Sequence, residues 1–345
     1  MVLKSGQTLI ADKVILAAGN QAPADFRVRG LDVRSPRYIA DPWGDGEQRR
    51  LPAPDRDVVL VGTGLTMVDV FLVLQAQGWR GKIWAVSRHG LLPLSHFKGF
   101  DYPDLIKDEG KDEGVRFSLR RAFALFKEHY RATQRFRLNP AILVDKLRPH
   151  TQRLWKNFSA FEKRQFNRHL RTPWNVMRHR VAPEIHRQLT DALAQGRLEV
   201  LAGRLTECVE SSEAITIRVT GRGGRRVIEA GAVINCTGPR ESYVTAEPGL
   251  FANLAARGLL QPDEMNMGIR VAADFAVLDA KGNPSQTLYA LGSLLKGTLW
   301  ETTAVPELRS QAFRLAGTIA GQLAETPAGR SPFAEVVEDV IEYFI

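Results

Sequence analysis

The sequence is poor in cysteine, and its two cysteines lie far apart. Cys208 and Cys236 form no closely spaced pair. This argues against a disulfide framework, a zinc site and a dithiol redox centre. We therefore predict no metal site and expect no disulfide-reductase chemistry.

The sequence also lacks an apolar run that would span a bilayer comfortably. Its longest such run, residues 58–74, contains two glycines and Asp69, and a spanning helix needs about 20 apolar residues. The amino-terminal end has a polar pattern with turns and no apolar signal core. We expect a soluble cytoplasmic protein with no membrane partner.

Acidic residues are too few to balance the basic ones, and the imbalance is confined to one segment. The formal net charge is +9, and residues 98–188 hold 21 of the 47 Lys and Arg but 10 of the 38 Asp and Glu. Aromatic and basic residues alternate there, as on a nucleic-acid surface. Amphipathic helices whose arginines face water explain the pattern more simply. Because no nucleic-acid-binding motif accompanies the charge, no nucleic-acid partner is expected.

The most informative stretch is a glycine-rich turn between a strand-like and a helix-like segment. The apolar run at 58–61 ends in the turn 62–64, which reads Gly-Thr-Gly; a helical pattern follows at 65–77 and a strand-like run at 82–86. In such a βαβ unit the second glycine lets the backbone approach a pyrophosphate at the positive end of the helix. Met67 stands at the third glycine position, so a buried corner without a ligand is the alternative.

The residues after the second strand-like run indicate which dinucleotide would bind. About 20 residues past the glycines, an NAD-preferring domain places an acid on the ribose 2′-hydroxyl. This sequence reads Ser87-Arg88-His89-Gly90 at that place. A bidentate guanidinium suits a 2′-phosphate instead. We therefore predict NADPH rather than NADH, with the alternative that Arg88 is a solvated loop residue.

The rest of the chain alternates between strand-like and helical stretches. A hairpin is expected from strands at 7–10 and 13–17, followed by a loop-like crossing to residue 54. Residues 97–186 are helical and charged, with several helices separated at Gly110, Gly114, Pro140, Pro149, Pro173 and Pro183. After Gly196 the period of strands appears, with predicted strands at 198–201, 205–209, 215–219 and 227–228 and a turn at 221–224.

Three apolar segments share one form, a buried strand that ends in a small residue and glycine. They are Lys13–Gly19, Ala232–Gly238 and Leu288–Ser293. After the last of these, Pro306 begins a long helix with Glu307 in its first turn, where an acid suits the helix dipole. A helix start beside a strand-end glycine can offer backbone N–H groups to an anionic oxygen.

In this order, the motifs resemble those of flavoproteins with two dinucleotide-binding domains, in which an NADPH domain is inserted into an FAD domain. Val14–Gly19 and Val233–Gly238 look like the two hinge strands, 62–64 looks like the NADPH fingerprint, and Tyr289–Gly292 looks like the late FAD motif.

Two further segments, Leu170–Arg180 and Leu299–Arg309, look more like one bacterial subgroup of FAD/NAD(P)-binding proteins, which includes FAD-dependent urate hydroxylase. The resemblance implies an α/β fold with a Rossmann-like NADPH-binding domain at 55–238 and a helical insertion at 97–188. This domain would be inserted into a partial FAD-binding domain of the same class, residues 1–54 and 239–345.

The resemblance implies an FAD-dependent, NADPH-consuming oxidoreductase of the monooxygenase type that acts on a small molecule. NADPH would reduce the flavin, and the reduced flavin would activate dioxygen. The implied NADPH contacts are Gly62, Thr63, Gly64, Leu65 and Thr66 for the pyrophosphate and Ser87 and Arg88 for the 2′-phosphate. The implied FAD contacts are Gly292, Pro306, Glu307 and Leu308, with the glycines of the hinge strands, Gly19 and Gly238, also at cofactors.

Catalytic residues are not evident, because no acid–base pair stands out. Trp174, His179 and Arg180 are the candidates for substrate contact, since the resemblance places them in an insertion able to cap the site, and Arg180 suits an anionic substrate. The alternative is that Trp174 packs in a core and Arg180 pairs with a carboxylate.

The sequence departs from the family in three places. No strand–G-x-G-x-x-G–helix for FAD precedes Gly62, and Ser293 replaces the usual Asp after Gly292. The F-x-G-x-x-x-H stretch of Baeyer–Villiger and N-oxide-forming flavin monooxygenases is also absent, and Tyr38–Trp43 stands in its place, so neither reaction type is implied. We expect an amino-terminally truncated chain. The alternative function is an NADPH-binding module or an inactive flavoprotein fragment, without flavin, whose basic helical insertion is a partner-binding surface.

Overall fold

The structure, a computed structural model, describes residues 3, 5–44, 51–106, 117–244 and 249–324. Contacts divide the chain into two compact units, each assembled from separate stretches of sequence. The first unit contains residues 1–20, 150–163 and 241–345, and the second contains residues 21–149 and 164–240. No helix in the described stretches is both long and apolar enough to cross a membrane.

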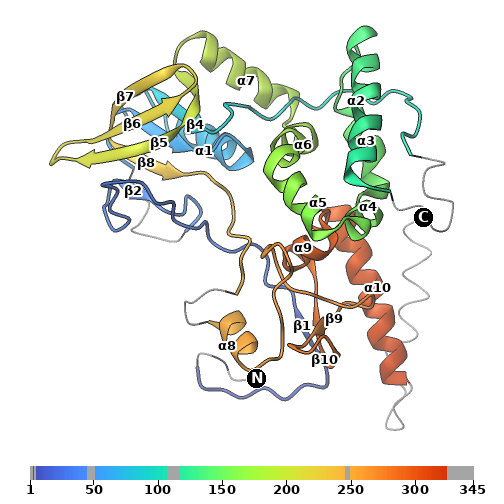
Figure 1. Cartoon of the computed structure of the whole chain (residues 1–345). Helices are drawn as coiled ribbons and strands as arrows, with labels where there is room; N and C mark the ends of the chain where they lie inside the picture. The colour runs from blue at the N-terminus through green and yellow to red at the C-terminus, as the bar shows by residue number, and fades with distance from the viewer. Residues whose placement is uncertain (1–2, 4, 45–50, 107–116, 245–248, 325–345) are drawn as a thin grey trace. The chain divides into compact units, whose positions relative to one another are not determined.

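The second unit is built on a seven-stranded sheet with the strand order β2-β8-β3-β4-β5-β6-β7 (Figure 1). The strands are β2 (Tyr38–Ile39), β3 (Val58–Val61), β4 (Ile83–Ser87), β5 (Leu198–Glu210), β6 (Ile215–Gly221), β7 (Gly224–Ala230) and β8 (Ala232–Asn235). Pairs from β2 to β5 are parallel, and those from β5 to β7 are antiparallel. The chain moves from β3 to β4 on one side and returns as β8 on the other. The carboxyl ends of β3 and β8 therefore form a topological switch point, where open α/β sheets bind ligands.

The predicted strand–helix–strand unit is present as β3, α1 (Leu65–Ala76) and β4. Residues 58–60 are fully buried, as expected for a parallel strand covered on both faces. Helix α1 buries Met67, Phe71 and Leu74 in the same core. It ends before Gly78, whose φ of 70° is a conformation that glycine adopts without strain.

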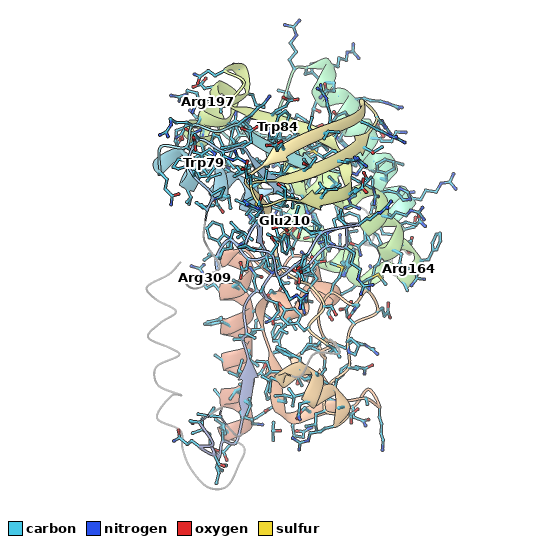
Figure 2. All side chains as sticks on the ribbon, turned by 90° about the vertical axis from the view of Figure 1, so that its left-hand side faces the viewer. Trp79, Trp84, Arg164, Arg197, Glu210 and Arg309 are labelled. Atoms are coloured by element: carbon cyan, nitrogen blue, oxygen red, sulfur yellow. The ribbon has the colours of Figure 1, made fainter. Side chains whose placement is uncertain are left out.

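Polar side chains fix the amino-terminal ends of β3 and β4. The carboxylate of Asp57 accepts hydrogen bonds of 2.9 Å from the backbone N–H of Lys82 and from the indole N–H of Trp84, which is labelled in Figure 2. The Lys82 ammonium lies 2.6 Å from a carboxylate oxygen of Glu199 on β5 and 4.0 Å from the centroid of the Trp84 ring. These contacts connect three adjacent strands and thereby hold their register.

Strands β5, β6 and β7 form the antiparallel end of the sheet. The sequence predicted two strands at 198–201 and 205–209, but β5 is continuous because β6 pairs with it beyond Gly203. A side chain at Gly203 would lie 2.8 Å from Val219 Cγ1, so this close approach requires glycine. The turn predicted at 221–224 is present between β6 and β7.

The segment predicted to be helical contains several helices, as expected. They are α2 (Leu119–Arg135), α3 (Ile142–Leu147), η2 (Arg148–His150), α4 (Thr151–Asn157), α5 (Ala160–Gln165), η3 (Phe166–Leu170), α6 (Arg171–Arg178) and α7 (Pro183–Ala194). The predicted breaks at Gly110 and Gly114 lie outside the described residues. The break predicted at Pro173 is wrong: Pro173 lies in the first turn of α6, directly after the wide π turn η3. A first turn tolerates proline, and a π turn relieves a missing backbone hydrogen bond.

The first unit contains a three-stranded sheet with the order β1-β10-β9. Strand β1 (Val14–Leu16) is parallel to β10 (Pro284–Ala290), which is antiparallel to β9 (Ala276–Leu278). The helices are α8 (Leu250–Ala256), η4 (Gly292–Leu295), α9 (Lys296–Leu299) and α10 (Val305–Ala324). The strand predicted at 7–10 is wrong. Within residues 5–20 only β1 is a strand, and Ile10 is 97% exposed, so no core holds the expected hairpin.

The predicted domain limits at 54/55 and 238/239 stay predictions. The contacts place residues 21–54 in the second unit and α4 in the first. On α4, the indole N–H of Trp155 donates to the Gly297 carbonyl at 2.7 Å, and its ring centroid lies 4.7 Å from that of Trp300. Part of the helical segment thus packs in the core of the first unit.

Candidate functional site

The turn after β3 lies at the switch point of the seven-stranded sheet. Gly62 has a φ of 116°, and a Cβ there would lie 2.2 Å from the Cys236 carbonyl oxygen at the end of β8. Both its backbone conformation and the neighbouring strand therefore require glycine. Gly64 differs: its φ is −86°, and a Cβ there would meet no heavy atom within 4 Å. The backbone at Gly64 faces open space, as close approach of a ligand requires.

The start of α1 is a favourable place for an anion. Gly64 is the N-cap, no side chain caps the helix, and its first turn contains no acidic residue. Leu65 is 39% exposed and Thr66 is half-buried in that turn. The first backbone N–H groups of a helix have no partner within it, and the helix dipole favours negative charge there. The five residues from Gly62 to Thr66 can therefore cradle a phosphate.

Thr63 and Ser87, both predicted NADPH contacts, are bonded to each other. Thr63 Oγ1 donates to the Leu91 carbonyl at 2.6 Å and lies 2.9 Å from Ser87 Oγ. Because the single hydroxyl hydrogen of Thr63 goes to Leu91, Ser87 is the donor in the second bond. Ser87 Oγ also accepts a hydrogen bond of 3.0 Å from the backbone N–H of Gly90. The hydroxyl hydrogens of Thr63 and Ser87 are thus both used in bonds that fix the loop after β4.

Arg88 is exposed on this loop. Within the described parts of the chain, its guanidinium has no hydrogen bond or ion pair. Strands β3 and β4 are parallel, with Val61 opposite Val86, so the loops that follow them leave the same edge of the sheet. The structure therefore places a free cation at the edge that also carries the open backbone of Gly64.

Asn235 is a residue of the switch point that the sequence analysis missed. It is fully buried at the end of β8. Its Oδ1 accepts hydrogen bonds from Thr237 N at 3.2 Å and Thr237 Oγ1 at 2.7 Å, and its Nδ2 donates to the Ala24 carbonyl at 3.1 Å. These bonds shape the turn before Gly238, which has a φ of 87°. The sequence did contain a signal for this residue: an amide side chain at the end of the apolar run 232–235, which must find hydrogen-bond partners when buried.

In the first unit, the predicted FAD contacts Gly19 and Gly292 follow the adjacent parallel strands β1 and β10. Their φ values are 66° and 75°. Ser293 Oγ donates to the Gly19 carbonyl at 2.6 Å and so connects the two turns. An ionised aspartate at this position has no hydrogen to donate. A serine can therefore make this bond between the two turns, whereas the Asp of the flavoproteins that the sequence resembles could not.

The backbone N–H of Gly292 already has a partner. It donates to Gln311 Oε1 at 3.2 Å; Gln311 Nε2 donates to Thr302 Oγ1 at 2.7 Å, and Thr302 Oγ1 donates to the Gly292 carbonyl at 2.9 Å. Thr302 and Gln311 are buried. A Cβ at Gly292 would lie 3.4 Å from Leu308 Cδ2, so Leu308 packs directly over this turn. Gly292 and Leu308 are therefore in contact with each other, and this contact is internal packing.

A hollow of about 190 Å³ lies beside the start of α10 in the first unit. Its lining residues are Gln152, Phe275, Leu299, Pro306, Glu307, Ser310, Gln311 and Arg314. Two of the predicted FAD contacts, Pro306 and Glu307, are therefore together in one concave surface. The Arg314 guanidinium lies 5.0 Å from the centroid of the Phe275 ring, which gives the hollow one aromatic and cationic wall.

The three candidates for substrate contact have other partners in the second unit. The Trp174 ring makes an edge contact with Phe166, with centroids 6.1 Å apart. Arg180 forms a bidentate pair with Asp145, with N···O distances of 2.9 and 3.0 Å, and its side chain is 11% exposed. His179 is half-buried at the end of α6. This geometry matches the alternative of aromatic packing and a carboxylate partner, and substrate contact stays a prediction.

Each of the two units contains parallel strands and helices, so the chain has an α/β fold. No protein-family model and no curated protein matches the sequence, but solved structures match the fold. The Kutzneria sp. 744 ornithine N-hydroxylase, in a complex described with reduced FAD, NADP+ and L-ornithine, is 14% identical with a TM-score of 0.54, over 90% of this chain and 64% of that one.

Two other solved structures give similar values. Ornithine hydroxylase from Pseudomonas aeruginosa is 13% identical with a TM-score of 0.58, over 93% of this chain and 65% of that one. L-lysine 6-monooxygenase from Pseudomonas syringae is 16% identical with a TM-score of 0.53, over 90% of this chain and 63% of that one. The chain thus spans just under two thirds of the length of these three proteins and shares their α/β fold.

Proposed function

We propose that this chain forms the NADPH-binding part and some of the FAD-binding part of an FAD-dependent monooxygenase. The observation that carries the proposal is the switch point of the second unit, where the open backbone of Gly64 and the free guanidinium of Arg88 lie at one edge of the sheet. A dinucleotide phosphate suits both groups. The shared fold with FAD- and NADP-dependent monooxygenases supports the second half of the proposal.

For NADPH, the turn from Gly62 to Thr66 would hold the pyrophosphate through backbone N–H groups. Arg88 would bind the 2′-phosphate. Ser87 would act through its position, because its hydroxyl hydrogen is bonded to Thr63; we assign it the role of presenting Arg88. Gly238 would let the chain turn at the end of β8, the strand that pairs with β3.

For FAD, only some of the predicted contacts in the first unit suit the flavin end of the cofactor. Pro306 and Glu307 line a hollow at the start of α10, whereas the Gly292 N–H is bonded to Gln311. We therefore propose that α10 and the turn at Gly19, rather than the Gly292 amide, would contact the flavin. The bound flavin would supply the redox chemistry, and the chain would orient it.

The proposed substrate is a small nitrogen-containing molecule that becomes hydroxylated. The solved neighbours act on ornithine and lysine, and the bacterial subgroup that the sequence resembles includes urate hydroxylase. Trp174, His179 and Arg180 stay candidates for its contacts, although Arg180 would have to leave Asp145.

The first experiment is an absorbance spectrum of the purified chain with added FAD, followed by NADPH under air. Flavin uptake and bleaching by NADPH would support the flavoprotein proposal. Retained NADPH binding without flavin uptake would favour the alternative, an NADPH-binding module whose basic helical segment recruits a partner. The closed hydrogen-bond ring around Gly292 is the observation that keeps this alternative open.

A matched pair of variants tests the assignment to NADPH. Arg88→Ala removes a charge-assisted phosphate contact, and its NADPH affinity should fall about 10- to 100-fold while NADH affinity stays the same. Arg80→Ala removes another exposed arginine, near the amino-terminal end of β4, and should change neither affinity. Titration calorimetry measures both. Equal losses for NADPH and NADH in Arg88→Ala would contradict the 2′-phosphate contact.

A further inference from the structure

Helix α2 (Leu119–Arg135) has a surface that the proposed cofactor sites do not use. It has 17 residues and buries one side chain, Thr133. Five of its residues are Lys or Arg and one, Glu128, is acidic. The helix therefore presents a long, strongly basic and largely exposed surface.

Aromatic side chains lie along one flank of α2. Phe123 and Tyr130 are 40% and 39% exposed, and their spacing of two helical turns places them on the same side. Tyr130 stacks on Phe126 with a centroid distance of 6.3 Å. Just past the helix, Phe136 is 66% exposed, and the Arg135 guanidinium lies 5.8 Å from its ring centroid.

Basic side chains flank these aromatic rings. Arg120, Lys127 and Arg131 are exposed. Arg120 and Lys127 are three and four residues from Phe123 and so lie beside it, and Arg131 is one turn past Lys127. The Lys127 ammonium lies 5.9 Å from the Phe123 ring centroid. The far side of the helix faces its own unit, where His129 Nδ1 lies 3.1 Å from the Tyr102 hydroxyl. We call the exposed set of Arg120, Phe123, Lys127, Tyr130 and Arg131 the α2 stripe.

We propose that the α2 stripe binds the surface of a membrane that contains anionic phospholipids. Exposed aromatic rings beside lysines and arginines match the interface of such a membrane, where rings enter the headgroup region and long basic side chains reach the phosphates. The excess of positive charge on α2 complements an anionic leaflet. The sequence-based expectation of no membrane partner rested on the lack of a spanning run, and surface binding needs none.

A single-stranded nucleic acid fits the α2 stripe less well. Its bases need free aromatic faces for stacking and a basic groove that follows the backbone. One face of Tyr130 is occupied by Phe126, and Lys127 lies over Phe123. The stripe is also the outer side of one helix, which suits a broad surface better than a strand.

The test is co-sedimentation of the full chain with vesicles of phosphatidylcholine and phosphatidylserine. We expect binding to these vesicles and none to phosphatidylcholine alone. The variant Arg120→Glu, Lys127→Glu, Arg131→Glu should lower the partition constant by about 100-fold or more, since each basic residue near an anionic surface contributes about fivefold. The double variant Phe123→Ser, Tyr130→Ser should lower it by about tenfold, through lost apolar contact.

A matched control changes the same charges elsewhere. Arg222, Arg225 and Arg226 are exposed around the β6–β7 turn, and replacing all three by Glu should leave vesicle binding within about twofold. A loss as large as that of the α2 variant would overturn the proposal, and so would equal binding to neutral vesicles. Each variant should unfold at the same temperature as the wild type. A loss of vesicle binding then comes from the changed surface and not from a destabilised fold.

A fluorescent label gives a second measurement that does not depend on these substitutions. Cys208 and Cys236 are 2% and 3% exposed, so a thiol label on Gln134→Cys reports from the exposed end of α2. Its emission should shift to shorter wavelength with anionic vesicles and stay unchanged with a single-stranded RNA. The reverse result would assign the α2 stripe to nucleic acid and refute the membrane proposal.

Discussion

Replacing Gly62 and Gly64 by alanine, one at a time, separates the fold of the βαβ turn from its ligand. The two glycines are two residues apart, but their surroundings differ. A methyl group at Gly62 would overlap the Cys236 carbonyl, whereas one at Gly64 would enter open space. We expect Gly62→Ala to weaken the fold and Gly64→Ala to weaken NADPH binding.

The structure sets the size of each effect. In Gly62→Ala, a φ of 116° strains alanine by about 1–3 kcal/mol. The end of β8 must also shift, which weakens the 2.8 Å bond from Cys236 N to the Val61 carbonyl by about 1 kcal/mol. The free energy of unfolding should fall by about 2–4 kcal/mol in sum.

In Gly64→Ala, the smaller entropy of the unfolded chain, about 0.4–1 kcal/mol, offsets the N-cap preference for glycine over alanine. Stability should therefore change by less than about 1 kcal/mol. The methyl group stands where the pyrophosphate would approach, and the loss of one bond to a charged group lowers affinity by about 10- to 100-fold.

Urea denaturation measures stability and titration calorimetry measures NADPH affinity for both variants. Equal losses of stability in the two variants would mean that the clash with β8 does not distinguish the two glycines. Wild-type NADPH affinity in Gly64→Ala would mean that the open backbone at Gly64 is not the phosphate site.

Three further substitutions test individual contacts. Burial raises the pKa of the Cys236 thiol to about 12 from 9.0. The unfolded chain therefore loses this proton first, and the free energy of unfolding falls by up to about 4 kcal/mol as pH rises from 9 to 12. Urea denaturation of Cys236→Ala should show a smaller decrease in stability over this pH range. Arg180→Ala leaves the partly buried carboxylate of Asp145 without its cation, and thermal unfolding should show a loss of about 1–3 kcal/mol with unchanged NADPH affinity. Gly297→Ala places a Cβ 1.9 Å from Asp263 Cγ, and denaturation should show a loss of about 1–3 kcal/mol from overpacking; wild-type stability would mean that this buried carboxylate moves freely.

The parts of the fold that local sequence determines were predictable. The βαβ unit combines an apolar run, glycines and a helical period within about 30 residues, and β3, α1 and β4 lie where predicted. Pairing between distant segments was not predictable in the same way. Strand β5 is one strand because β6 pairs along it, and the strand expected at 7–10 is absent because no apolar surface covers Ile10.

The candidate site shows the same division. A glycine-rich turn and an arginine after β4 are visible in the sequence, and both lie at the carboxyl edge of the seven-stranded sheet. The different environments of Gly62 and Gly64 are not visible, because the carbonyl that excludes a side chain at Gly62 belongs to Cys236, on a strand far along the chain. Likewise, the engagement of Ser87 by Thr63 joins the ends of two strands, and only their pairing brings the hydroxyls together.

The two outer strands of the seven-stranded sheet offer little to edge-to-edge pairing with a second sheet. Strand β2, at one end of the sheet, has two residues and offers few backbone groups to a second molecule. Strand β7, at the other end, has seven residues and an exposed Val227, but Arg225, Arg226 and Glu229 are exposed along it. Charged side chains on an edge strand oppose edge-to-edge pairing of sheets. The arginines of this hairpin therefore oppose edge-to-edge pairing, and replacing them with threonine would remove that charge from the edge strand β7.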